Sequence, residues 1–213
     1  MRPRGVAHLS LERWQAACDA VGAHGAEREH RKLLRAWRSW GRHYHTLEHL
    51  SACLRELDAA RSLARAPAEV ELALWFHDAI YRTYRSDNEV RRAQWAASFL
   101  RAHGAAPAAA ERIASYVLAT RHDGAPPPGD AALVVDIDLA ILGQPDDVYD
   151  AFERNVRKEY WWVPRRRYAE ARARILASLL RRTPLYHRRR FRERYEAPAR
   201  RSLERAVAGL TSQ

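Results

Sequence analysis

The sequence is poor in cysteine. Only Cys18 and Cys53 occur among its 213 residues, and neither belongs to a C-x-x-C pair. This spacing argues against a disulfide framework and against a metal site built from thiolates. Such cysteine usage suits a reducing compartment, and we therefore expect a cytoplasmic protein.

Long apolar runs are also missing. No segment approaches the roughly 20 apolar residues that a membrane-spanning helix needs. Near the N-terminus, Glu12 and Arg13 interrupt the kind of apolar stretch that a signal peptide would contain. We therefore expect a soluble protein without a membrane partner. The oligomeric state does not follow from the sequence.

Runs of β-branched residues are scarce, whereas residues with high helix propensity dominate. Glycine and proline fall mostly between periodic segments, and no parallel-sheet pattern is present. We predict an all-α fold, a bundle of about nine or ten helices in which residues 1–213 form a single domain. The expected helices cover residues 11–21, 26–40, 43–64, 67–78, 87–103, 107–121, a short segment ending at Gly143, 145–161, 164–182 and 186–209. Pro198 is expected to kink or break the last of them.

The positive charge is concentrated near the C-terminus. Residues 157–205 hold 17 Lys+Arg against 5 Glu and no Asp, a surplus of 12, so the rest of the chain sums to −1 of the total +11. Such a stripe attracts nucleic acid, anionic lipid or phosphorylated molecules. Because 35 of the 37 basic residues are Arg and alanine is abundant, as in proteins from GC-rich genomes, we interpret the stripe first as a solvated surface.

An adjacent imidazole and carboxylate interrupt an apolar run at residues 74–81, where His77 is followed by Asp78. Burying this pair is costly unless a partner such as a divalent cation neutralises it. Residues 43–49 and 134–140 likewise set polar groups in apolar surroundings. Together they offer a mixed nitrogen and oxygen ligand set, which suits Mn, Fe, Co, Ni or Mg better than a structural zinc.

These segments resemble the HD-domain metal-dependent phosphohydrolases, whose ligand pattern is H…HD…D on a bundle of helices. Residues 44–49 look like the Y-H-x-x-x-H signature of cyclic-nucleotide phosphodiesterases, in which the first His donates a proton and the second binds metal. With residues 87–89, 136–143 and 157–160, the chain is most similar to a bacterial branch of predicted HD phosphohydrolases that has no agreed substrate. The metal core would cover about residues 43–143, followed by an Arg-rich helical part at about 145–213.

The resemblance implies roles for individual residues. The expected metal ligands are His49, His77, Asp78 and Asp138. The expected catalytic residues are His45, the general acid, and Glu89, which could orient a ligand or water. The expected substrate-binding residues are His122, Arg157 and Tyr160. Glu89 could equally be an ordinary acid of a helix first turn, and His122 an exposed residue at a helix end. The tryptophans Trp75, Trp161 and Trp162 are expected in the core rather than as base-stacking platforms.

Two assignments depend on helical geometry. On one helix, His45 and His49 would stand about 40° apart on the same face. Asp136 and Asp138 would point about 200° apart, so only one of them can face the ion. We expect Asp138 to be the ligand and Asp136 to cap the short helix that follows, or to support the ligand.

The leading hypothesis is a metal-dependent phosphohydrolase acting on a small phosphate ester such as a nucleotide. A bound metal would lower the pKa of water and polarise a phosphoryl oxygen, and His45 would protonate the leaving oxygen. The alternative is a non-catalytic, metal-containing module that binds nucleic acid through the Arg-rich C-terminal helices. Of the two partners, the small phosphorylated substrate is favoured over nucleic acid.

Overall fold

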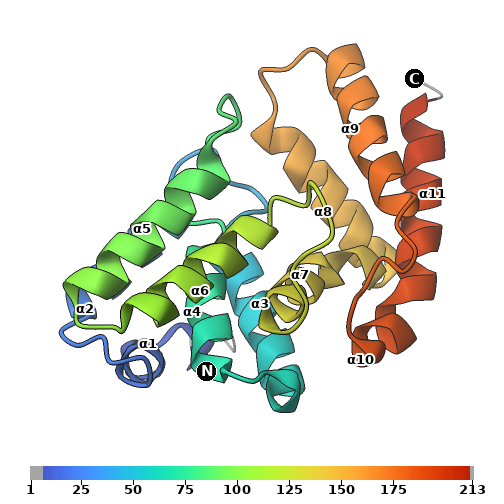
Figure 1. Ribbon diagram of the computed structural model, residues 1–213. Coiled ribbons are helices and arrows are strands. Elements are labelled where there is room, and N and C mark those ends of the chain that lie inside the picture. The colour runs from blue at the N-terminus through green and yellow to red at the C-terminus, as the bar shows by residue number, and fades with distance from the viewer. Residues whose placement is uncertain (1–6, 212–213) are drawn as a thin grey trace. The chain divides into compact units, whose positions relative to one another are not determined.

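The computed structural model describes residues 7–211, whose regular structure is entirely helical (Figure 1). The all-α prediction is therefore confirmed. The chain divides into two compact units, Met1–Ile137 and Asp138–Gln213, while a single domain over residues 1–213 stays a prediction. None of the helices in the described part of the chain combines the length and apolar character that crossing a membrane requires.

The first unit is built around helix α4. Its α-helices are α1 (Leu11–Asp19), α2 (Glu27–Trp37), α3 (Leu47–Ala60), α4 (Pro67–Phe76), α5 (Asn88–Ala102), α6 (Pro107–Ala119) and α7 (Asp130–Asp138), of which α7 ends one residue past the boundary. Short 3-10 helices cover Ala7–Leu9 and Arg61–Leu63. Helix α4 contacts α1, α3, α5 and α6, and α5 packs along α6, as the two green helices in Figure 1 show.

Helix α4 is buried on all its faces, including two acidic residues, Glu69 and Glu71. A buried carboxylate is tolerated when a cation and hydrogen bonds satisfy it. Arg112 pairs with Glu69 at 2.6 Å, and Arg13 pairs with Glu71 at 2.8 Å. The two arginines thus let a mostly apolar helix with two buried carboxylates occupy the centre of the unit. The C-terminal end of this helix leads directly into His77 and Asp78.

Helix α3 begins later than the sequence predicts. Thr46 has extended backbone angles, and its hydroxyl accepts the N–H of Glu48, so it is the N-cap and Leu47 the first helical residue. His45 therefore lies in the turn before the helix, and the prediction that His45 and His49 share one helical face is wrong. Similarly, α4 ends at Phe76, which leaves His77 at the C-cap and Asp78 in the following turn.

Helix α7 is longer than the short segment expected after Asp136. It starts at Asp130, whose carboxylate accepts the N–H groups of Arg65 and Ala66, and it continues to Asp138. Asp136 is fully buried in its last turn, so the prediction that Asp136 caps a helix is wrong. The apolar residues before Asp136 form helix rather than an extended lead-in, and Asp138 occupies the N-cap position of the next segment without a side-chain capping bond.

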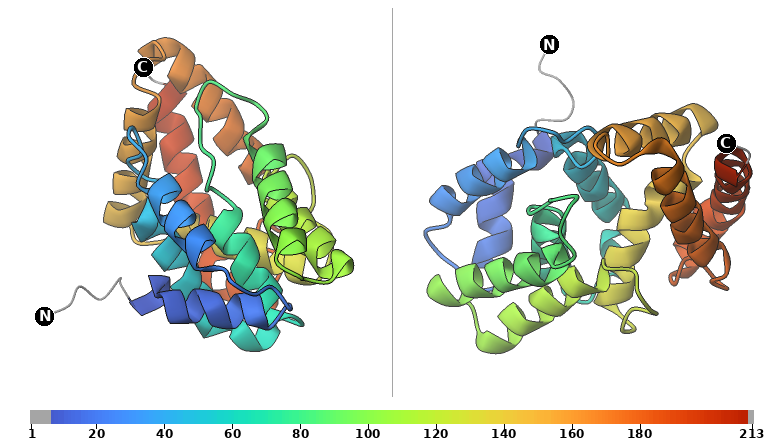
Figure 2. Two further views of the ribbon diagram at one scale, coloured as in Figure 1. Left: turned by 90° about the vertical axis from the view of Figure 1, so that its left-hand side faces the viewer. Right: turned by 90° about the horizontal axis from the view of Figure 1, so that it is seen from above.

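The second unit contains a 3-10 helix (Leu139–Gly143), α8 (Asp146–Glu159), α9 (Arg165–Leu180), α10 (Arg189–Phe191), a π-helix (Arg192–Glu196) and α11 (Ala197–Thr211). Helices α9 and α11 pack along each other, as the orange and red ribbons in both views of Figure 2 show. The chain stays helical past Pro198, but the preceding turn widens into the π-helix. A proline lacks the N–H for the usual bond and its ring crowds the carbonyl four residues earlier.

Three tryptophans were expected in the core, and one of them is there. Trp75 is fully buried, and its carbonyl accepts the indole N–H of Trp37 at 3.0 Å. In contrast, Trp161 is 67% exposed and Trp162 is 48% exposed. The expectation for these two residues is wrong, because they occupy the turn between α8 and α9 rather than a helix face.

We expect His30 to make the stability of the first unit depend on pH. Burial lowers the pKa of His30 below its ordinary value of 6.5, against the hydrogen bond to the Leu9 carbonyl and with help from the charge of Arg31. The unfolded chain then binds more protons as pH falls below 6.5, so stability is lost on acidification and unaffected above that value. Urea unfolding at about pH 7 and about pH 5 measures how much stability is lost on acidification. This loss should be smaller for His30→Gln than for wild type.

The control for this experiment is His24→Gln, because the His24 side chain is 73% exposed and stays solvated in both states. An equal acid loss in wild type and in both variants would show that His30 does not contribute.

Candidate metal centre

His77 presents one ring nitrogen to the site in a fixed chemical state. Its Nδ1 lies 2.7 Å from the carbonyl oxygen of Leu74. Because a carbonyl can only accept, Nδ1 must carry the proton, which leaves the lone pair of the neutral ring on Nε2. The ring is fully buried and packs against Trp37 at a centroid distance of 5.4 Å. This backbone contact orients His77 as it would orient a metal ligand.

His49 faces His77 from the first turns of α3. The Nε2 atoms of the two rings are 3.1 Å apart, and the His49 side chain is almost fully buried. Its position on the helix follows from the Leu50, Leu54 and Leu57 stripe, whose burial fixes the rotation of α3. Two imidazole nitrogens thus approach each other where water has little access.

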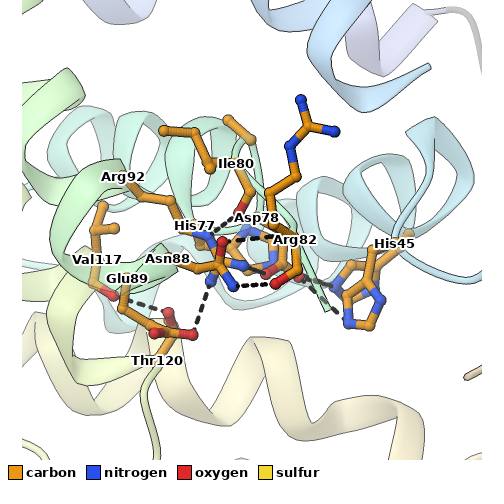
Figure 3. Close-up of polar contacts among 12 residues, drawn as sticks. His45, His77, Asp78, Ile80, Arg82, Asn88, Glu89, Arg92, Val117 and Thr120 are labelled. Carbon is orange, nitrogen blue, oxygen red and sulfur yellow. Dashed lines mark hydrogen bonds and ion pairs between the residues drawn. The ribbon is translucent and has the colours of Figure 1, made fainter. Parts of the chain in front are cut away.

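Asp78 completes the convergence with one of its two carboxylate oxygens. Its Oδ2 lies 3.3 Å from Nε2 of His77 and 3.6 Å from Nε2 of His49. The other oxygen, Oδ1, is 3.0 Å from a guanidinium nitrogen of Arg92. The carboxylate therefore divides its two oxygens between the histidines and the arginine, as Figure 3 shows for Asp78, His77 and Arg92. We refer to His49, His77 and Asp78 as the histidine–aspartate cluster.

The spacing within this cluster fits a divalent cation. Ligand bonds of about 2.1 Å at right angles place neighbouring donor atoms about 3.0 Å apart. The three donor separations of 3.1, 3.3 and 3.6 Å are close to this value. The donors approach each other closely in a buried site, and the contact with Leu74 fixes the direction of the lone pair on His77 Nε2. These features match the donor set of a metal centre.

Two further residues lie near these donors. One potential ligand atom from each of His49, Cys53, His77 and Asp138 lies within 4.8 Å of the others, and Asp138 is the last residue of α7. A buried group of His, Cys and Asp that could hold a metal ion is thus present. Sequence reasoning had set Cys53 aside as a ligand, because it is far from the other cysteine in the chain.

The position of Cys53 differs from that of Asp78. Its Sγ is 3.8 Å from both Nδ1 and Nε2 of His49, one helical turn away. An ion bound to Nε2 of His49 lies much nearer to Nε2 than to Nδ1. A further ligand atom on that ion would likewise be nearer to Nε2 than to Nδ1. The equal distances place the sulfur beside the ring, so we favour Asp78 over Cys53 in the ligand set.

Two substitutions separate these alternatives. We expect Asp78→Asn to lose metal, because a neutral amide replaces the anionic ligand oxygen, whereas Cys53→Ala should retain stoichiometric metal and lose about 1 kcal/mol of stability from the small cavity. Elemental analysis of both purified variants and chemical denaturation provide the measurements. Metal loss in Cys53→Ala with retention in Asp78→Asn would assign the thiolate instead.

His45 lies beside the cluster without belonging to it. Its Nε2 is 3.8 Å from Oδ2 of Asp78, longer than a hydrogen bond, and its side chain keeps 16% exposure. The ring stacks on Tyr81 at a centroid distance of 4.0 Å with an interplanar angle of 24°. His45 is therefore a restrained imidazole at the accessible edge of the buried donors.

Arg92 is a site residue that the sequence analysis missed. It is 3% exposed, and it donates to the carbonyl of Ile80 while contacting Asp78 and Glu89 (Figure 3). On α5 it follows Asn88 by four residues and precedes Ala96 by four, and both of these are buried. An arginine in line with a buried helical stripe was the available signal. Here it fixes the orientation of the Asp78 carboxylate.

We expect Arg92→Lys to weaken metal binding about 10- to 100-fold, as the loss of outer contacts to a ligand commonly does. Lysine keeps the charge, so repulsion toward the cation is retained, but it lacks the fork that reaches Asp78 and Ile80 together. Calorimetric titration of the ion-free protein gives the affinity. Arg91→Lys, at a half-exposed neighbouring arginine, is the control, and equal affinities in both variants would remove the positioning role.

Arg42 is a second residue that was missed, and it joins the two loops of the site. Its guanidinium donates to the carbonyls of His45, Asp78 and Ala79 at 2.7 to 3.0 Å. It also lies over the ring of Trp37 at 5.4 Å. No motif marks this arginine, because its role is to satisfy backbone carbonyls of turns that come together only in the fold.

The remaining predicted residues of the first unit occupy different surroundings. Glu89 is partly buried and pairs with Arg92 at 3.3 Å, so it contacts the cluster through that arginine. His122 follows α6 and has a left-handed backbone with φ of 57°. Its imidazole is half-buried. Its role in substrate binding stays a prediction.

Arg157 and Tyr160 were predicted to bind substrate, and the structure gives Arg157 a contact role within its own unit. Its guanidinium donates to the carbonyls of Tyr160 and Val163 at 2.5 and 3.0 Å and lies 4.7 Å from the ring centroid of Tyr168. The guanidinium N–H groups that were expected to bind phosphate thus donate to backbone carbonyls of the turn that follows α8. Substrate binding by these two residues stays a prediction.

Comparisons with known proteins identify no relative. No family model matches the chain, and neither a curated protein nor a solved structure matches it. The fold and the site therefore define the class by themselves: an all-helical protein with a buried group of His, Cys and Asp residues that could hold a metal ion.

Proposed function

We propose that the protein is a metal-dependent phosphohydrolase that acts on a small phosphate ester such as a nucleotide. The observation that carries the proposal is the convergence of His49 Nε2, His77 Nε2 and Asp78 Oδ2 at separations of 3.1 to 3.6 Å. The order of these residues along the chain also resembles the H…HD…D pattern of the HD-domain phosphohydrolases, with Asp138 as the final carboxylate. An all-helical fold is compatible with that resemblance.

The ligand set would be His49, His77, Asp78 and Asp138. Imidazole and carboxylate donors suit Mn, Fe, Co or Ni, and water-rich carboxylate sites suit Mg. A divalent ion bound there supplies Lewis acidity toward a phosphoryl oxygen and lowers the pKa of water. Leu74 and Arg92 would serve this set by fixing the His77 ring and the Asp78 carboxylate.

His45 would act as the general acid. A protonated imidazole at Nε2 gives its proton to the ester oxygen that leaves phosphorus, which makes the alcohol a better leaving group. Tyr81 limits the motion of the ring by stacking on it. The accessible edge of His45 is where a substrate oxygen can approach.

The test has two stages. Elemental analysis of the purified protein identifies the metal, and a phosphate-release screen over nucleotides is then run with that metal and with chelator-treated protein. We expect turnover only with metal. Asp138→Asn should lose the ion, whereas Asp136→Asn should keep it. Stoichiometric metal without phosphate release from any ester would overturn the enzyme proposal. Failure to bind a divalent metal at every metal concentration tried would overturn the proposed metal site.

A further inference from the structure

The turn between α8 and α9 presents an unusual surface. Trp161 and Trp162 are 67% and 48% exposed, and after Pro164 the chain continues with three exposed arginines. All of these residues lie in the second unit. We call Trp161, Trp162, Arg165, Arg166 and Arg167 the tryptophan–arginine patch.

The turn is held in place from within its own unit. Arg157 donates to the carbonyls of Tyr160 and Val163, one on each side of the two tryptophans, and its guanidinium lies over the ring of Tyr168. The backbone that carries the indoles is therefore tied to α8 and α9. Rings displayed on a fixed turn lose little freedom on binding, which favours association.

Folding does not account for this patch. Exposed indoles forgo the burial that makes tryptophan stabilising. The first turn of α9 contains three arginines and no acidic residue, and these arginines oppose the positive end of the helix dipole. The Arg166 side chain is 92% exposed and pairs with Glu170 of the same helix at 3.1 Å. Both features are better explained by a partner that is aromatic and anionic.

We propose that the tryptophan–arginine patch binds single-stranded nucleic acid. Unpaired bases stack on exposed aromatic rings irrespective of sequence. Guanidinium forks match the geometry of backbone phosphates. The surrounding surplus of 12 positive charges over residues 157–205 would attract the polyanion. This inference does not depend on the proposed hydrolase activity, because it concerns a different set of residues.

Two other anionic partners fit the patch less well. In a duplex the faces of the bases are stacked on one another, so the indoles would have nothing to stack on. A helix that lies in a membrane interface needs an apolar face. The exposed side chains of α9 include Arg174 and Glu170, with Ile175 the large apolar one at 52% exposure. The chemistry therefore favours a single strand over a duplex or an anionic bilayer.

Fluorescence anisotropy with a labelled oligothymidylate of about 12 nucleotides tests the stacking. We expect Trp161→Ala and Trp162→Ala each to weaken binding roughly 5- to 100-fold. Trp40→Ala is the matched control, because Trp40 is 90% exposed but lies in the first unit, and it should leave affinity unchanged. Circular dichroism should show all three variants folded, since the removed rings are on the surface.

The arginines are tested by salt dependence. Replacing Arg165, Arg166 and Arg167 together by glutamine should reduce the slope of log affinity against log salt by about 2, or about 0.7 for each phosphate that is no longer neutralised. The control is the same replacement of three other exposed arginines of the second unit, Arg181, Arg189 and Arg190. Equal losses in the two triple variants would show diffuse attraction and overturn the site.

Three further outcomes would also overturn the proposal. They are unchanged affinity in both tryptophan variants, equal or tighter binding of a duplex of the same length, and binding to phosphatidylserine vesicles without binding to the oligonucleotide. Loss of binding confined to the patch variants, with phosphate release and metal content unchanged, would support it. The result is therefore separable from the fate of the hydrolase proposal.

Discussion

Replacing His77 by alanine is expected to abolish stoichiometric metal binding. The substitution removes one of three donors that lie 3.1 to 3.6 Å apart and leaves His49 and Asp78 facing each other without the third ligand. The ion-free variant should also lose about 2–4 kcal/mol of stability, because a fully buried ring and its bond to Leu74 disappear. Elemental analysis and urea unfolding provide the two measurements.

A metal titration distinguishes loss of the site from loss of the fold. Saturation at about 100 times the dissociation constant should add about 2.7 kcal/mol to the stability of the wild type and nothing to that of His77→Ala. The control is His103→Ala, because His103 also sits at a helix C-cap and its Nδ1 also contacts a carbonyl, that of Phe99 at 2.9 Å. If His77→Ala kept one equivalent of metal, the ligand assignment would be wrong.

His45→Ala is expected to keep its metal and lose roughly 10²-fold or more in kcat. His45 lies 3.8 Å from the Asp78 carboxylate, outside the histidine–aspartate cluster, so its removal would take away the proposed proton donor and spare the proposed ligands. The rate should fall most for substrates with poor leaving groups, because an activated ester such as a nitrophenyl phosphate leaves without protonation. Rates on both kinds of ester, with metal content measured in parallel, provide the test.

The control for this substitution is His43→Ala, two residues earlier in the same loop and exposed. It should retain the wild-type rate. If His45→Ala lost metal instead of rate, His45 would be a ligand and the role of His49 would come into question. An equal fall for both kinds of ester would argue for a positional rather than an acid role.

Some properties of this protein were determined by its sequence alone. Helix propensity and the spacing of apolar residues indicate an all-α chain. Burying one face of a helix requires apolar residues every three or four positions, and this spacing is visible in the sequence. The His77–Asp78 doublet inside an apolar run indicates a buried polar pair that needs a partner. The helix end near Gly104 and the helix starts at Pro107 and next to Pro145 are also local, since a backbone preference acts within one or two residues.

Other properties were decided by tertiary structure. Helix α3 begins at Leu47 rather than at His43, so His45 approaches Asp78 from a turn and not from a helical face. Trp161 and Trp162 have apolar rings, yet only the path of the turn after α8 decides that they stay exposed. Composition shows what a side chain prefers, whereas burial depends on what the rest of the chain brings next to it.

The surroundings of the proposed metal ligands depend most on tertiary structure. Arg92 contacts Asp78 from fourteen residues later in the chain, and Arg42 bonds Asp78 and Ala79 across the first unit. A ligand motif is readable because the metal requires particular donor atoms at short spacing. The groups that orient those donors can come from any part of the chain, because a hydrogen bond depends on distance and direction in space and not on separation in sequence.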